Sequence, residues 1–91
     1  LPLNEAKTKF YLAQGATLID VRSQNEFASG SVEGALNYPL ESLEDCGDFF
    51  QQGDFLLFCA SGTRSHIASE KLKAQGLVNV YNAGALANVK E

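Results

Sequence analysis

Several residue types are scarce in this sequence. Its 91 residues include no methionine or tryptophan, two prolines, two cysteines and one histidine. Two cysteines allow at most one disulfide, and we expect both thiols to be reduced because the chain can bury a core without a covalent link. A zinc site is short of ligands unless carboxylates complete it, so we expect no metal. A sequence that begins with Leu1 is expected to be a processed mature chain or a fragment of a longer one.

Basic residues are also few. Seven Lys and Arg face eleven Asp and Glu, which gives a net charge of −4 at pH 7. Nucleic-acid binding needs clustered Lys and Arg, so we expect no nucleic-acid partner. A small anionic substrate needs a local positive site to overcome the repulsion from this net negative charge. The longest apolar runs, such as residues 55–60, are far shorter than the about 20 residues that a bilayer requires, so we expect no membrane insertion.

The remaining composition is typical of a globular protein, with 45% hydrophobic and 20% charged residues. The length predicts one domain over residues 1–91. Extended and helical signals alternate along the chain without a repeat or a linker. This alternation predicts an α/β fold with a mainly parallel central sheet and helices on both faces.

The pattern of apolar residues and turn signals gives the expected elements. We expect strands at 17–21, 35–38, 55–59 and 78–81, and helices near 3–13, 23–30, 42–50, 63–75 and 85–90. The first of these helices has Leu3, Ala6, Phe10 and Ala13 at helical spacing. The third begins at a Ser42 cap and carries Leu43, Cys46 and Phe50 on one face. Cys46 is interpreted as a packing residue, with a second redox thiol as the alternative. The fourth directs Ile67, Ala68 and Leu72 inward.

The segment Cys59-Ala60-Ser61-Gly62-Thr63-Arg64-Ser65 joins the most apolar strand to a helix. A thiol in this position faces backbone N–H groups and the positive end of the helix, which lower its pKa and stabilise anionic sulfur. Gly62 lets the loop curl, and Arg64 can fork onto an oxyanion. We therefore interpret Cys59 as a nucleophile and residues 60–65 as its substrate-binding cradle. The alternative is a core cysteine that ends a hydrophobic strand.

Four segments resemble, in order, the motifs of the rhodanese-like family over nearly the whole chain. They are residues 18–22 (LIDVR), 26–39 (EFASGSVEGALNYP), 59–65 (CASGTRS) and 81–86 (YNAGAL). The nearest resemblance is to small single-domain thiosulfate sulfurtransferases, including the phage-shock protein E type. Ser31 stands where the family usually has His, and Ala85 where it often has a second Gly. Neither position does chemistry in the family.

The resemblance implies an enzyme that moves sulfane sulfur from thiosulfate or a similar donor to a thiol or cyanide through a Cys59 persulfide. It implies no cofactor. Asp20 is expected to brace the site by hydrogen bonds, and Arg22 to pair with a carboxylate such as Glu26; the alternative for both is a plain surface ion pair. We expect a monomer. The resemblance favours a periplasmic mature chain, with a cytoplasmic one as the alternative.

Two other functions stay open at this point. One is a non-catalytic rhodanese-like module used for docking or regulation, although such modules have commonly lost the cysteine. The other is a cysteine phosphatase or arsenate reductase. Four residues separate Cys59 from Arg64, whereas cysteine phosphatases have five, and a shorter ring suits one sulfur atom better than a tetrahedral phosphate. His66 is interpreted as a solvated helix residue, since a low-pKa thiolate needs no base.

Overall fold

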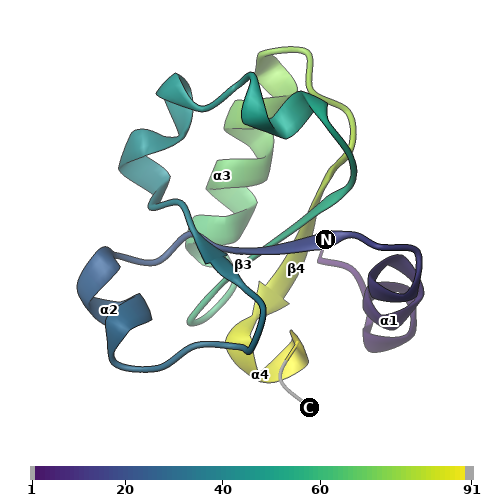
Figure 1. Ribbon diagram of the computed structural model, residues 1–91, viewed down its shortest axis with the longest axis vertical. Helices are drawn as coiled ribbons and strands as arrows, with labels where there is room; N and C mark the ends of the chain where they lie inside the picture. The colour runs from purple at the N-terminus through teal and green to yellow at the C-terminus, as the bar shows by residue number, and fades with distance from the viewer. Residues whose placement is uncertain (1, 90–91) are drawn as a thin grey trace.

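The structure, a computed structural model, describes residues 2–89. Four strands form one sheet in the order β2-β1-β3-β4, and every neighbouring pair is parallel. The strands are β1 (Thr17–Asp20), β2 (Leu36–Asn37), β3 (Phe55–Cys59) and β4 (Val80–Ala85). Their carboxyl ends therefore meet at one edge of the sheet (Figure 1). This is the edge at which parallel α/β sheets place their sites.

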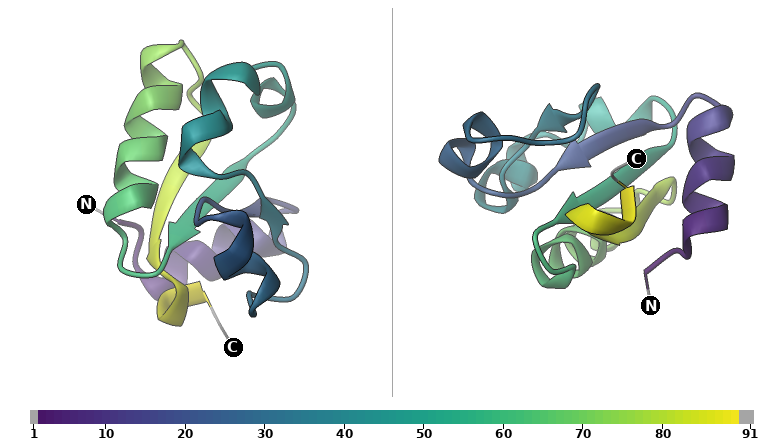
Figure 2. Two further views of the ribbon diagram at one scale, coloured as in Figure 1. Left: turned by 90° about the vertical axis from the view of Figure 1, so that its left-hand side faces the viewer. Right: turned by 90° about the horizontal axis from the view of Figure 1, so that it is seen from below.

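Helices cover both faces of the sheet, as the sequence predicted (Figure 2). They are α1 (Glu5–Ala13), α2 (Gln24–Ala28), α3 (Thr63–Ala74) and α4 (Leu86–Val89), with two 3₁₀ turns, η1 (Leu40–Asp45) and η2 (Phe49–Gln51). One apolar cluster joins α3, η1 and η2 to one face, and a second joins α1 and α4 to the other. None of the helices within residues 2–89 is long and apolar enough to cross a membrane.

Strand β3 is the centre of the fold because both of its faces are buried. Phe55, Leu57 and Cys59 point into the cluster under α3, whereas Leu56 and Phe58 point into the opposite cluster. A strand buried on both faces requires a continuous apolar run, which explains the sequence FLLFC. Cys59 is the last residue of this buried strand, and the chain leaves the sheet directly after it.

The expected helix at 42–50 is wrong, because η1 and η2 take its place. The Ser42 hydroxyl donates to the Pro39 carbonyl at 2.9 Å and caps no helix. Glycine destabilises a helix interior by about 1 kcal/mol relative to alanine, and Gly47 would lie in the interior of a continuous helix over residues 42–50. Two short turns still bury one large residue each, Leu43 and Phe50.

Ile67, which was expected to face inward, is exposed, and so are three of the residues at helical spacing in the first helix, Ala6, Phe10 and Ala13. Phe10 is 58% exposed and Ile67 is 41% exposed. On α3 the inward positions are Ser65, Ala68, Ser69 and Leu72, a helical stripe that leaves Ile67 at its border. Helical spacing alone did not identify which side of the helix meets the sheet.

The last strand begins and ends later than the sequence predicted. Val78 is 76% exposed and lies before β4, which runs to Ala85. A register shift opposite Leu57 and Phe58 pairs these residues with Asn82 and Gly84, so β4 bulges at Ala83. The bulge brings Gly84 beside the cysteine loop. The expected end of the last helix at Lys90 lies outside the described residues.

We predict that Leu57→Ala lowers the free energy of unfolding by about 2–5 kcal/mol, because it leaves a cavity in a fully buried strand. Leu36→Ala, the same change on the exposed edge strand β2, should cost about 1 kcal/mol or less. Urea unfolding followed by circular dichroism measures both. Equal losses would contradict the central position of β3.

Candidate active site

The site begins at Cys59, which is fully buried at the end of β3. Directly after it, residues 60–62 curl back so that the Gly62 N–H donates to Cys59 Sγ at 3.0 Å. Gly62 has a φ of 96°, which a side chain would strain. A Cβ atom at this position would also lie 3.4 Å from the Gly84 Cα. That distance is an ordinary contact, so it is the backbone angle that favours glycine at position 62.

Two opposing effects act on the pKa of Cys59. Burial raises the pKa, because the protein interior solvates a thiolate poorly. The backbone N–H groups of Ser65, Ser61 and Gly62 and the Ser65 hydroxyl lower it, because they hydrogen bond to the anion. The donors prevail, and the pKa of Cys59 lies below the usual value for a thiol. The loop thus stabilises a negative sulfur from which water is excluded.

Ser65 connects this sulfur to β4. In the thiol form, Cys59 Sγ donates to Ser65 Oγ at 3.7 Å, and Ser65 Oγ donates to Asn82 Oδ1 at 2.6 Å. Asn82 Oδ1 also accepts from the Gly84 N–H at 2.9 Å. When Cys59 ionises, the Ser65 proton can turn from Asn82 to the thiolate. Asn82 is a site residue that the sequence interpretation missed; the available signal was its place in segment 81–86, one of the four that resemble the family motifs.

A second polar cluster lies at the end of β1, where Asp20 is fully buried. Arg22 forks onto it, with Nε 3.0 Å from both carboxylate oxygens and Nη2 2.8 Å from Oδ2. The Ser31 hydroxyl donates to the same Oδ2 at 2.8 Å, and Arg22 Nη2 donates to the Gly30 carbonyl at 2.7 Å. The expected pairing of Arg22 with Glu26 is therefore wrong. Asp20 lies at the end of β1, only two residues before Arg22, and its buried carboxylate binds the Arg22 guanidinium.

Glu26 pairs instead with Arg64 of the cysteine loop. Arg64 Nη1 lies 2.6 Å from Oε1, and Nη2 lies 3.0 Å from Oε2. The two side chains are 36% and 37% exposed. Hydrogen bonds from Arg64 and from the Ser23 backbone lower the pKa of Glu26 to about 2, while Glu26 raises the pKa of Arg64. The guanidinium expected to clamp a substrate is thus already engaged by a carboxylate.

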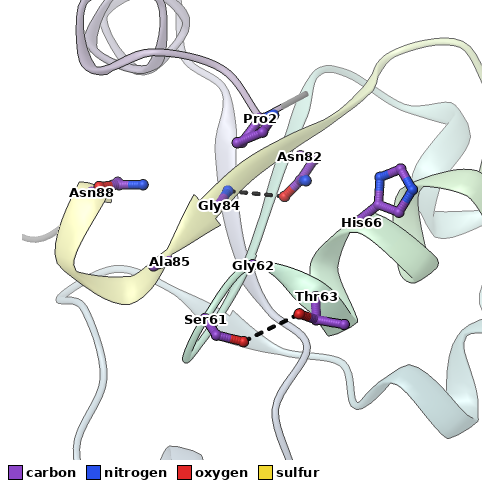
Figure 3. A pocket seen from close by; sticks show the side chains of 9 residues that line it. All are labelled: Pro2, Ser61, Gly62, Thr63, His66, Asn82, Gly84, Ala85 and Asn88. Carbon is purple, nitrogen blue, oxygen red and sulfur yellow. Dashed lines mark hydrogen bonds between the residues drawn. The ribbon is translucent and has the colours of Figure 1, made fainter.

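The remaining loop residues differ in exposure. Ala60, Ser61 and Thr63 are exposed at the rim, and Ser65 is buried beneath them. Ser61, Thr63, His66, Asn82 and Asn88 line a groove of about 430 Å³ that runs past Gly84 to α4 (Figure 3). Cys59 and Arg64 do not line this groove. Among residues 2–89, no three His, Cys, Asp or Glu side chains gather as a metal site would require.

Comparison with known proteins places the chain in a family. A sequence profile described as "Rhodanese-like domain" matches residues 4–85. This chain belongs to the rhodanese-like family. The chain is 32% identical over 74 residues to the thiosulfate sulfurtransferase GlpE of Pseudomonas entomophila, with 77% of this chain and 65% of that protein covered. The rhodanese-like chain is also 37% identical over 68 residues to the uncharacterized protein YqhL of Bacillus subtilis, with 74% and 54% covered.

Solved rhodanese-like structures share the fold. The human single-domain sulfurtransferase TSTD1 superposes with a TM-score of 0.77 at 28% identity, with 91% of this chain and 89% of that chain covered. A rhodanese-related protein from Thermoplasma volcanium gives a TM-score of 0.80 at 27% identity, with 97% and 88% covered. The chain spans only 54% and 65% of the two curated relatives named above.

We predict that Ser65→Ala raises the pKa of Cys59, because it removes one of the donors that stabilise the thiolate. The measurement is titration of the thiolate ultraviolet absorbance in a Cys46→Ser background. Ser69→Ala is the matched control: its buried hydroxyl donates to the His66 carbonyl at 2.9 Å, one turn further along α3. An unchanged titration in Ser65→Ala would show that the backbone donors suffice.

A second prediction concerns the Glu26–Arg64 pair. Because the folded-state pKa of Glu26 is about 2, below its ordinary 4.5, ionised Glu26 stabilises the fold above pH 4.5. This stabilisation is lost as the pH falls through about 2. Glu26→Gln should therefore have a lower melting temperature than the wild type at pH 7, with a difference that shrinks from pH 4.5 downwards. A difference independent of pH would contradict the assigned ion pair.

Proposed function

We propose that the protein is a sulfurtransferase that carries sulfane sulfur as a persulfide on Cys59. The observation that carries the proposal is the set of donors around a buried sulfur, with the Gly62 N–H 3.0 Å from Cys59 Sγ. A persulfide keeps a negative charge on its outer sulfur, which the loop amides match. Membership of the rhodanese-like family supports the same chemistry, since the relatives GlpE and TSTD1 are named as sulfurtransferases.

The reaction proceeds in two transfers. The Cys59 thiolate attacks the outer sulfur of thiosulfate, the sulfur–sulfur bond breaks, and sulfite leaves with the bonding electron pair. The charge balances: a thiolate and a dianion give a persulfide anion and a sulfite dianion. An acceptor thiolate or cyanide then attacks the outer sulfur of the Cys59 persulfide. The product is a new persulfide or thiocyanate, and the Cys59 thiolate is regenerated.

Access to the sulfur limits what can react. Cys59 is fully buried, and the exposed residues above it, Ala60 and Ser61, are small. A donor that presents one terminal sulfur atom can pass this rim, whereas a tetrahedral phosphate must enter as a whole. The four residues between Cys59 and Arg64 form a correspondingly small ring. The size of the cradle therefore favours sulfur transfer over phosphate-ester hydrolysis.

We predict that intact protein treated with excess thiosulfate or an organic persulfide gains the mass of one sulfur atom. Cyanide should remove it and release thiocyanate. Cys59→Ser should gain nothing, because a hydroxyl forms no persulfide, whereas Cys46→Ser should load like the wild type. Mass spectrometry measures each step after circular dichroism has confirmed folding.

Two outcomes would contradict the proposed function. One is an unchanged mass with every sulfane donor while the Cys59 thiol is free. The other is faster turnover of aryl phosphates than of sulfane donors. A Cys46→Ser variant that folds but does not load would point to a relay between two cysteines and would overturn the packing assignment of Cys46.

A further inference from the structure

Both arginines of the chain are bound to carboxylates. Arg22 is held by buried Asp20 at the end of β1, and Arg64 of the cysteine loop by Glu26, each through a forked pair of contacts. Each pair is neutral as a unit. The whole chain carries a net charge of −4, which adds a weak repulsion for anions. A dianionic substrate that approaches Cys59 thus finds the guanidinium groups of Arg22 and Arg64 already paired with carboxylates.

The Glu26 carboxylate is held in position independently of Arg64. It belongs to the capping box of α2: the Ser23 N–H donates to Glu26 Oε1 at 3.1 Å, and the Glu26 N–H donates to Ser23 Oγ at 3.2 Å. Arg64 reaches this fixed carboxylate from a position 38 residues later in the chain. To bind a second anion, Arg64 must leave a forked contact with a group that stays ionised at any neutral pH.

We propose that Glu26 sets the donor specificity of the site: by occupying Arg64, it disfavours dianionic thiosulfate and favours organic persulfides. This inference rests on the proposed sulfurtransferase function. A persulfide donor carries its single negative charge on the sulfur that is transferred, where the loop amides receive it. Thiosulfate carries a second charge on its sulfonate end, for which the site offers no unengaged guanidinium from Arg22 or Arg64.

The atoms balance for either donor. With a persulfide, the Cys59 thiolate attacks the outer sulfur, the donor's sulfur–sulfur bond breaks, and an organic thiolate leaves with the electron pair. With thiosulfate, the leaving group is sulfite, a dianion. The donors therefore differ in the charge that must be accommodated beside Glu26 and Arg64, and a change in charge at Glu26 separates them.

The test compares kcat/KM for thiosulfate and for 2-hydroxyethyl persulfide in the wild type and Glu26→Gln. Glutamine keeps the oxygen that accepts from Ser23 but removes the charge. We expect kcat/KM for thiosulfate to rise roughly three- to tenfold, as Coulomb's law gives for a dianion within one Debye length. The kcat/KM for the persulfide should stay within about twofold of the wild-type value. Its single charge is held by the loop amides, and solvent ions screen its interaction with residue 26.

Two controls make the comparison specific. Glu44→Gln removes the same charge from an ion pair with Lys71, seven residues beyond Arg64, and should change neither donor. Adding Arg64→Ala to Glu26→Gln should abolish most of the gain with thiosulfate, because the gain requires a free guanidinium. If Glu26→Gln fails to fold, the salt dependence of kcat/KM for thiosulfate in the wild type tests whether Arg64 is engaged. An engaged Arg64 predicts no loss of kcat/KM for thiosulfate between about 0.05 M and about 0.5 M salt.

The outcomes separate this inference from the proposed function. If Cys59 loads but Glu26→Gln changes both donors equally or neither, the specificity assignment is overturned and sulfur transfer stands. A steep loss of thiosulfate activity with salt in the wild type overturns it as well, since it would indicate a free guanidinium. If no donor loads Cys59, the proposed function fails, and the specificity assignment falls with it.

Discussion

A negative sulfur atom that is buried beyond the reach of water must receive hydrogen bonds from the protein. In this chain the requirement is met mainly by backbone N–H groups, of which the Gly62 donor lies 3.0 Å from Cys59 Sγ. Backbone donors serve this purpose only if the chain curls around the sulfur. The left-handed angle at Gly62, the close approach of Gly84 and the start of α3 at Thr63 all follow from that need. Cys59 is the last residue of β3, and the burial of this strand on both faces holds its sulfur at the start of the loop.

The polar side chains around the loop organise the protein, and their charges cancel in pairs. Asp20 and Arg22 hold the end of β1 against Gly30 and Ser31, whereas Glu26 and Arg64 tie α2 to the cysteine loop. Ser65 and Asn82 tie the loop to β4. A cradle built from amides and hydroxyls, with its guanidiniums neutralised, suits a group of low charge.

The differences between expectation and structure have specific physical causes. The segment from Ser42 to Phe50 carries apolar residues at helical spacing, but Gly47 disfavours a continuous helix and two 3₁₀ turns form instead. Phe10 and Ile67 lie at helical spacing too, yet a helix on a small four-stranded sheet buries only a narrow stripe. β4 begins at Val80 because Val80 pairs with Phe55 at the start of β3, and the bulge at Ala83 carries the pairing on to Ala85. A bulge depends on the partner strand as well as on the sequence of the bulged strand.

Local chemistry and motif order determined much of this protein. The central strand at residues 55–59, the capping box at Ser23, the parallel α/β sheet and the family follow from residues close together in sequence. Tertiary structure alone decided which charges meet. The family resemblance led us to expect a pair between Arg22 and Glu26. In the structure Arg22 instead binds Asp20 at the end of β1, and Glu26 binds Arg64, 38 residues away. Ion pairs depend on where side-chain ends meet in space, and that position is set by packing rather than by spacing along the chain.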